Sequence, residues 1–375
     1  MESVAALLRT EIERHGPVPY HRLVELALYA DSGFYGAGGG AGRRRDFITS
    51  VEVGPLFGTI VARALDQWWD DLGRPDSFVV VDAGAGPGTL ARSVLRAAPT
   101  CAPALRYVLV ERSARLRAQH GDGLELCPPH WSFAGSRGAA DDDDAVAPPP
   151  GPTVCSLAEL PAGEFTAVVI ANELLDNLAF DLLEHTDGGW AEVRVARTTS
   201  GFAELLVPAT QGAAELAERL APGSPVGARV PLQHGAADWL QRALSIVSAG
   251  RLVVLDYADT TASMARRSAS EWLRTYRAHD RGHDPLADLG AQDITCEVAV
   301  DQLARVRPPD LDRSQADFLR EHGIDDLVDE GRRVWQERAA APDLEAMTMR
   351  SRVREAEALL DPAGLGSFRV LEWER

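Results

Sequence analysis

The sequence from residue 78 to residue 98, FVVVDAGAGPGTLARSVLRAA, decides the fold. It starts as an apolar run that predicts a buried strand, breaks at Asp82 into glycines at positions 84, 86 and 88, and resumes with apolar residues at helical spacing. Glycine adopts the backbone angles of a tight turn cheaply, and its missing Cβ lets a ligand touch the main chain. The stretch therefore predicts a strand, a ligand-binding loop and a helix in succession.

Further apolar runs predict the rest of the sheet. They cover residues 107–110, 167–170 and 252–255, and a last run lies within 364–375. The first three are continuously apolar rather than alternating, which indicates strands covered on both faces of a parallel sheet. We therefore predict an α/β protein with a doubly wound, mostly parallel, Rossmann-like sheet, in which the last run forms an edge strand.

The chain divides into four predicted regions. Residues 1–73 predict N-terminal helices and a Gly-rich loop packed on the core. Residues 74–260 predict the core itself, with a solvated acidic and Pro-rich loop at 135–153. Residues 261–350 are rich in helix formers and predict a helical insertion that covers the substrate, and residues 351–375 predict a terminal helix and the edge strand.

Composition excludes several classes of function. Hydrophobic residues make up 45% of the 375 residues, and no apolar run reaches the roughly 18 residues that cross a bilayer, so we expect no membrane insertion. The net charge of -18 disfavours nucleic acid as a partner. Four scattered cysteines predict neither a metal site nor a disulfide framework. The first helix does not look like a leader peptide, so we expect a cytoplasmic protein, and positive charge carried by arginine alone suggests a bacterial genome rich in GC.

The glycine spacing distinguishes two classes of cofactor. A dinucleotide fingerprint has the spacing G-x-G-x-x-G, and here the third glycine falls one residue early. An acid followed by alternate glycines looks like the S-adenosylmethionine loop of class I methyltransferases. Both classes place a carboxylate for the ribose about 20 residues past the loop, and Glu111 stands 23 residues after Gly88. A structural turn without a ligand is the alternative. The expected cofactor-binding residues are Asp82, Gly84, Ala85, Gly86, Gly88, Glu111 and Asn172.

Polar residues follow the apolar run at 167–170. Asn172, Glu173 and Asp176 place an amide and two carboxylates within one predicted helical turn, where residues three apart share a face. Paired carboxylates can hold the fork of an arginine guanidinium, which stays protonated because its pKa lies above about 12. We therefore predict that these three residues are catalytic. The alternative is structural. In it, Asn172 caps a helix, and the two acids in the first turn interact favourably with the helix dipole.

Seven motifs, in order along the chain, carry a family resemblance. They are LALYADSGFYG (26–36), RDFITSVEVGPLFG (45–58), VVVDAGAGPGTL (79–90), VIANELLDNLAF (169–180), VVLDYAD (253–259), DITCEVAVDQL (293–303) and QADFLREHGI (315–324). With these motifs the chain resembles, over nearly its whole length, the MidA-type family of class I S-adenosylmethionine-dependent methyltransferases. That family includes the mitochondrial complex I assembly factor that methylates an arginine of a complex I subunit.

The resemblance implies a methyltransferase that uses S-adenosylmethionine and acts on an arginine of a protein partner. Whether the protein forms a homodimer stays open. It places four residues on the substrate side of the pocket: Asp46, Phe47, Thr49 and Glu52. The Gly-rich segment before Asp46 would then act as a lid, with a flexible surface loop as the alternative. The chain departs from the family where proline is usual, at Val51 and Ala179, and both changes bear on loops that shape the substrate side.

Two other functions stay open from the sequence. One is a non-catalytic assembly or chaperone-like protein that keeps the cofactor for stability, and the other is a methyltransferase that acts on a small molecule. The nine histidines form no ligand pair, so we predict surface or capping roles for them. Asp256 and Tyr257 follow the run at 252–255 on the edge that touches the crevice, although an acid at a strand end is commonly only a turn former.

Overall fold

A computed structural model of the chain describes residues 2–39, 49–133, 150–277, 280–282 and 284–375. The chain forms two compact units, each made of three segments. The first unit comprises Met1–Phe47, Glu173–Arg242 and Asp256–Pro308. The second unit comprises Ile48–Asn172, Ala243–Leu255 and Pro309–Arg375. The predicted acidic loop at 141–144 and the arginines of the predicted lid lie outside the described residues.

A seven-stranded sheet organises the second unit, in the order β16-β17-β10-β5-β2-β3-β4. Its strands are β2 (Phe78–Ala83), β3 (Leu105–Val110), β4 (Thr153–Leu157), β5 (Phe165–Asn172), β10 (Val247–Asp256), β16 (Leu311–Ser314) and β17 (Arg369–Glu374). The five strands from β10 to β4 are parallel, which confirms the predicted α/β sheet. β17 is not the edge strand that we predicted, because β16 pairs antiparallel with it and takes the outer place.

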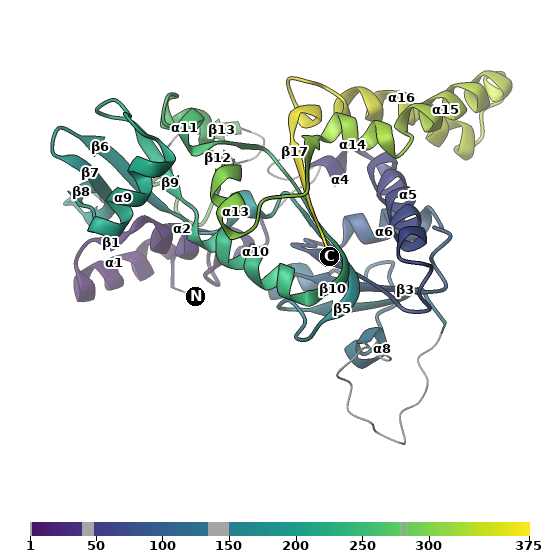
Figure 1. Ribbon diagram of the computed structural model, residues 1–375, viewed down its shortest axis with the longest axis horizontal. Helices are drawn as coiled ribbons and strands as arrows, with labels where there is room; N and C mark the ends of the chain where they lie inside the picture. The colour runs from purple at the N-terminus through teal and green to yellow at the C-terminus, as the bar shows by residue number, and fades with distance from the viewer. Residues whose placement is uncertain (1, 40–48, 134–149, 278–279, 283) are drawn as a thin grey trace. The chain divides into compact units, whose positions relative to one another are not determined.

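Both faces of the central strands are covered, as their continuous apolar sequence predicts. Phe78 and Val80 of β2 belong to the large core of the unit, and Val79 and Val81, which point to the opposite face, are buried as well. The helices of the unit are α4 (Ser50–Val53), α5 (Pro55–Asp71), α6 (Thr89–Arg96), α7 (Ala114–Arg117), α8 (Pro129–Phe133), α14 (Gln315–Glu321), α15 (Ile324–Arg338), α16 (Leu344–Leu359) and the 3-10 helix η2 (Leu365–Ser367). α5 and α6 pack on each other, and α15 lies beside α16 (Figure 1).

The amino end of α5 is held by a side chain from α16. Pro55 occupies the first helical turn, where a missing N–H costs nothing, and the N–H of Leu56 donates to Glu355 Oε2 at 2.9 Å. Glu355 is only 5% exposed, and a Cβ built on Gly54 would lie 2.2 Å from its carboxyl carbon. Glycine is therefore required at position 54 by this close approach.

The first unit contains an antiparallel sheet that the sequence analysis did not predict. β1 (Val18–Pro19), β7 (Gly189–Arg197), β6 (Asp181–Thr186) and β9 (Arg229–Leu232) are neighbours in this order, and β8 (Phe202–Pro208) pairs with β7. A three-stranded sheet has the order β13 (Asp280–Gly282), β12 (Leu273–Arg277), β14 (Asp293–Cys296), and a two-stranded one joins β11 (Ala258–Asp259) to β15 (Val298–Ala299).

The helices of the first unit accompany two hydrophobic cores. They are α1 (Val4–His15), α2 (Tyr20–Tyr29), α3 (Phe34–Ala37), α9 (Gln211–Leu220), α11 (Thr261–Met264), α12 (Ala269–Trp272), α13 (Val300–Val306) and the 3-10 helix η1 (Leu175–Asn177), while α10 (His234–Ile246) crosses the unit boundary at 242/243. Tyr20, Phe180 and Trp272 are among the largest fully buried side chains, and all three lie in the larger core. The buried residues of α9 lie in the smaller core.

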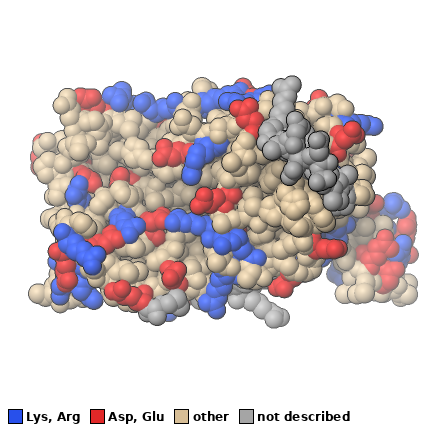
Figure 2. Space-filling view, turned by 90° about the horizontal axis from the view of Figure 1, so that it is seen from below, with Lys and Arg blue, Asp and Glu red and all other residues tan. Residues whose placement is uncertain are grey.

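None of the helices in the described part of the chain combines the length and apolarity that crossing a membrane needs. On the face of the molecule seen in Figure 2, arginine and acidic side chains are interspersed over most of the surface. No extended field of one sign is therefore visible on that face.

Candidate active site

The candidate cofactor site lies in the second unit, where the strand order reverses. β2 is followed in the sheet by β3 and β4 on one side, whereas β5 lies on its other side. Ligands of doubly wound sheets bind at such a switch point, beyond the carboxyl ends of the strands. Asp82 and Ala83 at the end of β2 pair with Ile170 and Ala171 of β5. The glycine loop and the end of β5 therefore share one edge of the sheet.

The glycine loop is closed by its own main chain. The N–H of Gly88 donates to the carbonyl of Ala85 at 2.8 Å, and the N–H groups of Gly84 and Ala85 donate to the carbonyl of Val110 at 2.9 and 3.0 Å. Gly86 has a φ of 55°, in the left-handed region that favours glycine, and a Cβ built there would meet nothing within 4 Å. The main chain of the loop is thus open to a ligand at Gly86.

Two carboxyl groups flank this loop. Asp82 is 3% exposed, and burial raises its pKa to about 7, although the hydroxyl of Tyr107 donates to it at 3.2 Å. Glu111 follows β3 and accepts the N–H of Gly86 at 3.0 Å and that of Ser113 at 2.7 Å. Burial raises the pKa of Glu111 while these two donors oppose the rise. The carboxylate of Glu111 is therefore fixed beside the loop, where the sequence predicts a ribose ligand.

One histidine beside the loop was not predicted to have a functional role. His120 is fully buried, with Nε2 2.8 Å from the carbonyl oxygen of Gly86 and Nδ1 2.8 Å from the hydroxyl of Ser156. The predicted surface or capping role is wrong for this residue. Its neighbours in the fold lie 34 and 36 positions away in sequence, so no local pattern marks it.

The predicted substrate-side residues are only partly described. Asp46 and Phe47 lie outside the described residues. Thr49 is buried, and its hydroxyl has no hydrogen-bond partner among the residues that the structure describes. Glu52 accepts the hydroxyl of Thr89 at 2.8 Å, at the first residue of α6. Glu52 therefore lies directly beside the end of the glycine loop.

The end of β5 differs from the predicted helical turn. Asn172 is the last residue of β5, and Glu173 follows with a φ of 51°, which is uncommon for a residue that has a Cβ. The helix after it is a single 3-10 turn that begins at Leu175, and its cap residue is Leu174, which has no side-chain cap bond. The alternative that Asn172 caps a helix is therefore wrong, and the strained backbone turns the chain from the second unit into the first.

Asp176, in the first unit, has one bonded carboxylate oxygen. Oδ2 accepts the hydroxyl of Tyr257 at 2.9 Å, whereas Oδ1 is buried and has no hydrogen-bond partner among the described residues. Burial raises the pKa of Asp176 to about 7, and the bond from Tyr257 opposes the rise. Asp256 accepts the N–H groups of Leu175 and Asp176 at 3.0 and 3.3 Å, so it holds the turn that carries Asp176.

A third buried acid completes what we call the acid cluster, consisting of Asp176, Asp256 and Asp293. Asp293 accepts Nδ2 of Asn177 at 3.0 Å and the hydroxyl of Tyr35 at 3.2 Å. Burial and the charge of Asp176 raise the pKa of Asp293 well above its ordinary range, and burial does the same for Asp256. Burial therefore favours the uncharged form of each carboxyl in the acid cluster.

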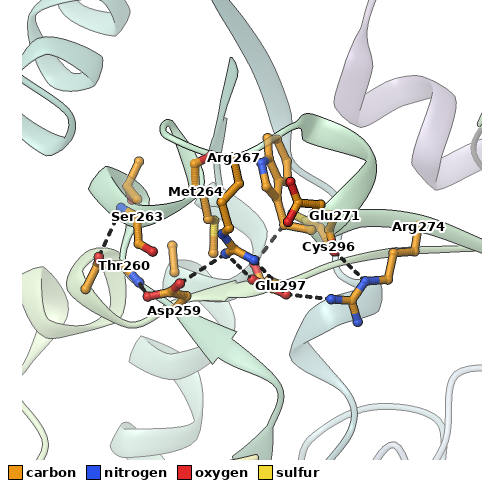
Figure 3. A network of polar contacts seen from close by, with 12 residues as sticks. Asp259, Thr260, Ser263, Met264, Arg267, Glu271, Arg274, Cys296 and Glu297 are labelled. Atoms are coloured by element: carbon orange, nitrogen blue, oxygen red, sulfur yellow. Dashed lines mark hydrogen bonds and ion pairs between the residues drawn. The ribbon is translucent and has the colours of Figure 1, made fainter. Parts of the chain in front are cut away.

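An arginine network contacts the ring of Tyr257 through Arg274, and Figure 3 shows how Arg267 and Arg274 share Glu297. The guanidinium of Arg274 lies 5.1 Å from the centroid of the Tyr257 ring and donates to Glu297 at 2.7 Å. Glu297 also accepts from Arg267 at 2.5 Å, and Arg267 donates to Asp259 at 3.0 Å. The positive charge of Arg274 also opposes the rise in the pKa of Asp176 that burial causes. The network therefore fixes the ring whose hydroxyl orients Asp176.

Among the described residues, no group of three or more histidine, cysteine, aspartate or glutamate side chains is placed to hold a metal ion. All four cysteines are free thiols, and three of them are buried.

Comparisons with known proteins give one family and several relatives. A family model described as "Putative S-adenosyl-L-methionine-dependent methyltransferase" matches residues 60–313. The mitochondrial protein arginine methyltransferase NDUFAF7 homolog of Drosophila melanogaster is 27% identical over 320 residues, which cover 79% of this chain and 68% of that protein. Protein arginine methyltransferase NDUFAF7 of Rattus norvegicus, also mitochondrial, is 23% identical over 377 residues, which cover 96% of this chain and 81% of that protein.

A solved structure is similar over almost the whole chain. It is a COG1565 superfamily member from Burkholderia thailandensis bound to S-adenosyl-homocysteine, with 26% sequence identity and a TM-score of 0.79. The similarity covers 99% of this chain and 92% of that one.

Proposed function

The chain belongs to the MidA- and NDUFAF7-like family of S-adenosylmethionine-dependent methyltransferases, and from this premise we propose that it methylates an arginine side chain of a protein partner. The arginine specificity draws support from the relatives, whose names describe protein arginine methyltransferases. It also draws support from Asp176, because its Oδ1, which has no partner among the described residues, can accept an N–H of a guanidinium.

We assign cofactor binding to the loop at the end of β2. Gly86 offers main chain without a Cβ on its open side, and Gly84 and Gly88 form the turn around it. Glu111 is held with its carboxylate beside the loop and would accept the ribose hydroxyls, while Asp82 and Asn172 provide polar groups at the ends of β2 and β5. The bound cofactor supplies an electrophilic methyl group on a sulfonium sulfur.

The acceptor would be gripped by Glu173 and Asp176. A guanidinium has five N–H donors in a rigid fork and stays protonated at neutral pH, so it needs carboxylate partners and loses a proton when it is methylated. Asp176 Oδ1 has no other hydrogen-bond partner among the described residues, and its pKa of about 7 suits a group that accepts a proton near neutral pH. In this assignment Glu173 orients the guanidinium and Asp176 takes the proton.

The single observation that carries the proposal is the carboxylate of Asp176, with Oδ2 held by Tyr257 and Oδ1 left for a donor. The test uses S-adenosylmethionine with a heavy methyl group and a total cell protein extract as acceptor. Mass spectrometry then locates heavy methyl groups on arginine, on lysine or on small molecules. We expect heavy methylarginine, and about a 100-fold lower rate for Asp176→Asn, which is the scale of general base catalysis.

Exposed Asp187→Asn in the same unit is the matched control, and its rate should equal that of the wild type. Heavy methyl groups found only on small molecules would show a different acceptor class. Binding of S-adenosyl-homocysteine without any methyl transfer would indicate the non-catalytic assembly function. A fully active Asp176→Asn would show that this carboxylate has no catalytic role.

A further inference from the structure

His120 bridges two parts of the second unit that are not neighbours in the sheet. Its imidazole lies between the carbonyl of Gly86, in the loop after β2, and the hydroxyl of Ser156, in β4. β3 separates these two strands in the sheet. The ring is fully buried, and a Cβ added at Gly88 would lie 3.6 Å from its Cδ2. The imidazole thus packs directly against the underside of the glycine loop.

The two hydrogen bonds determine the tautomer of this ring. A carbonyl oxygen can only accept, so Nε2 must carry the proton that it donates to Gly86. Nδ1 of a neutral ring is then an acceptor, and the hydroxyl of Ser156 donates to it. Burial lowers the pKa of His120, and the positive charges of Arg92 and Arg117 lower it further. The ring is therefore neutral at neutral pH.

His120 and Glu111 hold Gly86 from its two sides. Glu111 accepts the N–H of Gly86, and His120 donates to its carbonyl oxygen. The next carbonyl, that of Pro87, accepts from Arg92 at 2.8 Å. Gly86 is left-handed and has no side chain, so these contacts add to the main-chain bond from Gly88 to Ala85 in restricting its two peptide groups. The loop is thus fixed by side chains in the conformation that leaves its open face for the cofactor.

We propose that His120 is a positioning residue for the cofactor: its Nε2–H holds the Gly86 carbonyl, and Ser156 holds the ring in the tautomer that can do so. A loop already fixed in its binding conformation loses less conformational entropy when a ligand binds. His120 does not touch the cofactor in this assignment and acts only through Gly86. The inference goes beyond the proposed function, because it concerns cofactor binding and is independent of the methyl acceptor.

The test is calorimetric titration of the full chain with S-adenosyl-homocysteine. His120→Leu keeps the buried volume but removes the donor, and we expect about a tenfold weaker affinity, equal to about 1.4 kcal/mol. His120→Gln replaces the donor with an amide N–H that can reach the same carbonyl, and we expect its affinity within about threefold of the wild type. Ser156→Ala removes the hydroxyl that fixes the tautomer, and we expect an intermediate loss.

The matched control is His322→Leu, which changes another buried histidine of the same unit. His322 packs against Trp68 and Phe318 and has no contact with the glycine loop in the described structure. Its replacement should leave the affinity unchanged even if it alters stability. Wild-type affinity in His120→Leu would overturn the proposal. Equal losses in His120→Leu and His120→Gln would also overturn it, because they would show that ring volume rather than the donor matters.

A second measurement uses the unaltered protein. Nitrogen-15 correlation spectra of histidine distinguish a ring protonated on Nε2 from one protonated on Nδ1. We expect His120 to be neutral and protonated on Nε2 at about pH 7. A ring protonated on Nδ1 alone could not donate to Gly86, and this result would overturn the proposal even if the leucine variant failed to fold.

Discussion

Asp82 is expected to lower the stability of the folded protein at alkaline pH, and Asp82→Asn should remove this effect. The buried carboxyl has a pKa of about 7, raised from its ordinary value of 3.8 mainly by burial. Because the folded-state pKa is the higher one, the folded protein binds the proton more tightly between about pH 4 and about pH 7. The free energy of unfolding therefore falls as pH rises through that window. A difference of about three pKa units corresponds to about 4 kcal/mol as an upper bound.

The assay is equilibrium unfolding in urea, followed by tryptophan fluorescence at several pH values. Below about pH 4 the carboxyl of Asp82 is protonated in the folded and the unfolded protein alike, so wild type and variant should differ little there. At about pH 8 the variant should be more stable by several kcal/mol, because its amide can accept from Tyr107 without a charge. Asp76→Asn, an exposed acid before β2, is the control and should show no such change. A stability difference that stays constant between these pH values would refute the reasoning.

Tyr257→Phe removes a hydrogen bond to Asp176 worth about 1.5–3 kcal/mol. Its loss should raise the pKa of the Asp176 carboxyl by about one to two units. In a pH profile of the methyl-transfer rate, the rise on the acid side should therefore move to higher pH. Gly86→Val puts a branched side chain at a φ of 55° and into the open side of the loop, so calorimetry should show at least a tenfold loss, about 1.4 kcal/mol, of affinity for S-adenosyl-homocysteine. Glu355→Ala leaves the buried N–H of Leu56 unpaired and should lower the free energy of unfolding in urea by about 1–3 kcal/mol.

The glycine loop at the end of β2 and its neighbour Glu111 could be predicted from sequence because the parts are local. One strand, one loop and the next strand place Gly86 and Glu111 together, since Ala83 at the end of β2 pairs with Val110 at the end of β3. The continuous apolar runs likewise predicted the parallel strands, because the side chains on both faces of such a strand are buried and therefore mostly apolar. The position of β17 was missed because nothing in its own residues shows that β16 pairs with its outer side.

The acid cluster could not be assembled from sequence in the same way. Tyr257 meets Asp176 across 81 positions, and Asn177 meets Asp293 across 116. Such contacts depend on how the chain returns through the first unit, which no local pattern encodes. The antiparallel sheet did leave a signal in the sequence, because charged and apolar residues alternate from Glu192 to Val195 in β7. Reading that alternation would have predicted strands in the first unit.

The place of β17 has a consequence for the order in which the protein is synthesised. β17 lies between β16 and β10 in the sheet, but it is translated more than a hundred residues after β10. Until it emerges from the ribosome, β10 presents unpaired N–H and carbonyl groups along one side, and such an edge can pair with another chain. The nascent protein therefore passes through a stage in which its central sheet is open to aggregation, and shielding by a chaperone would matter most at that stage.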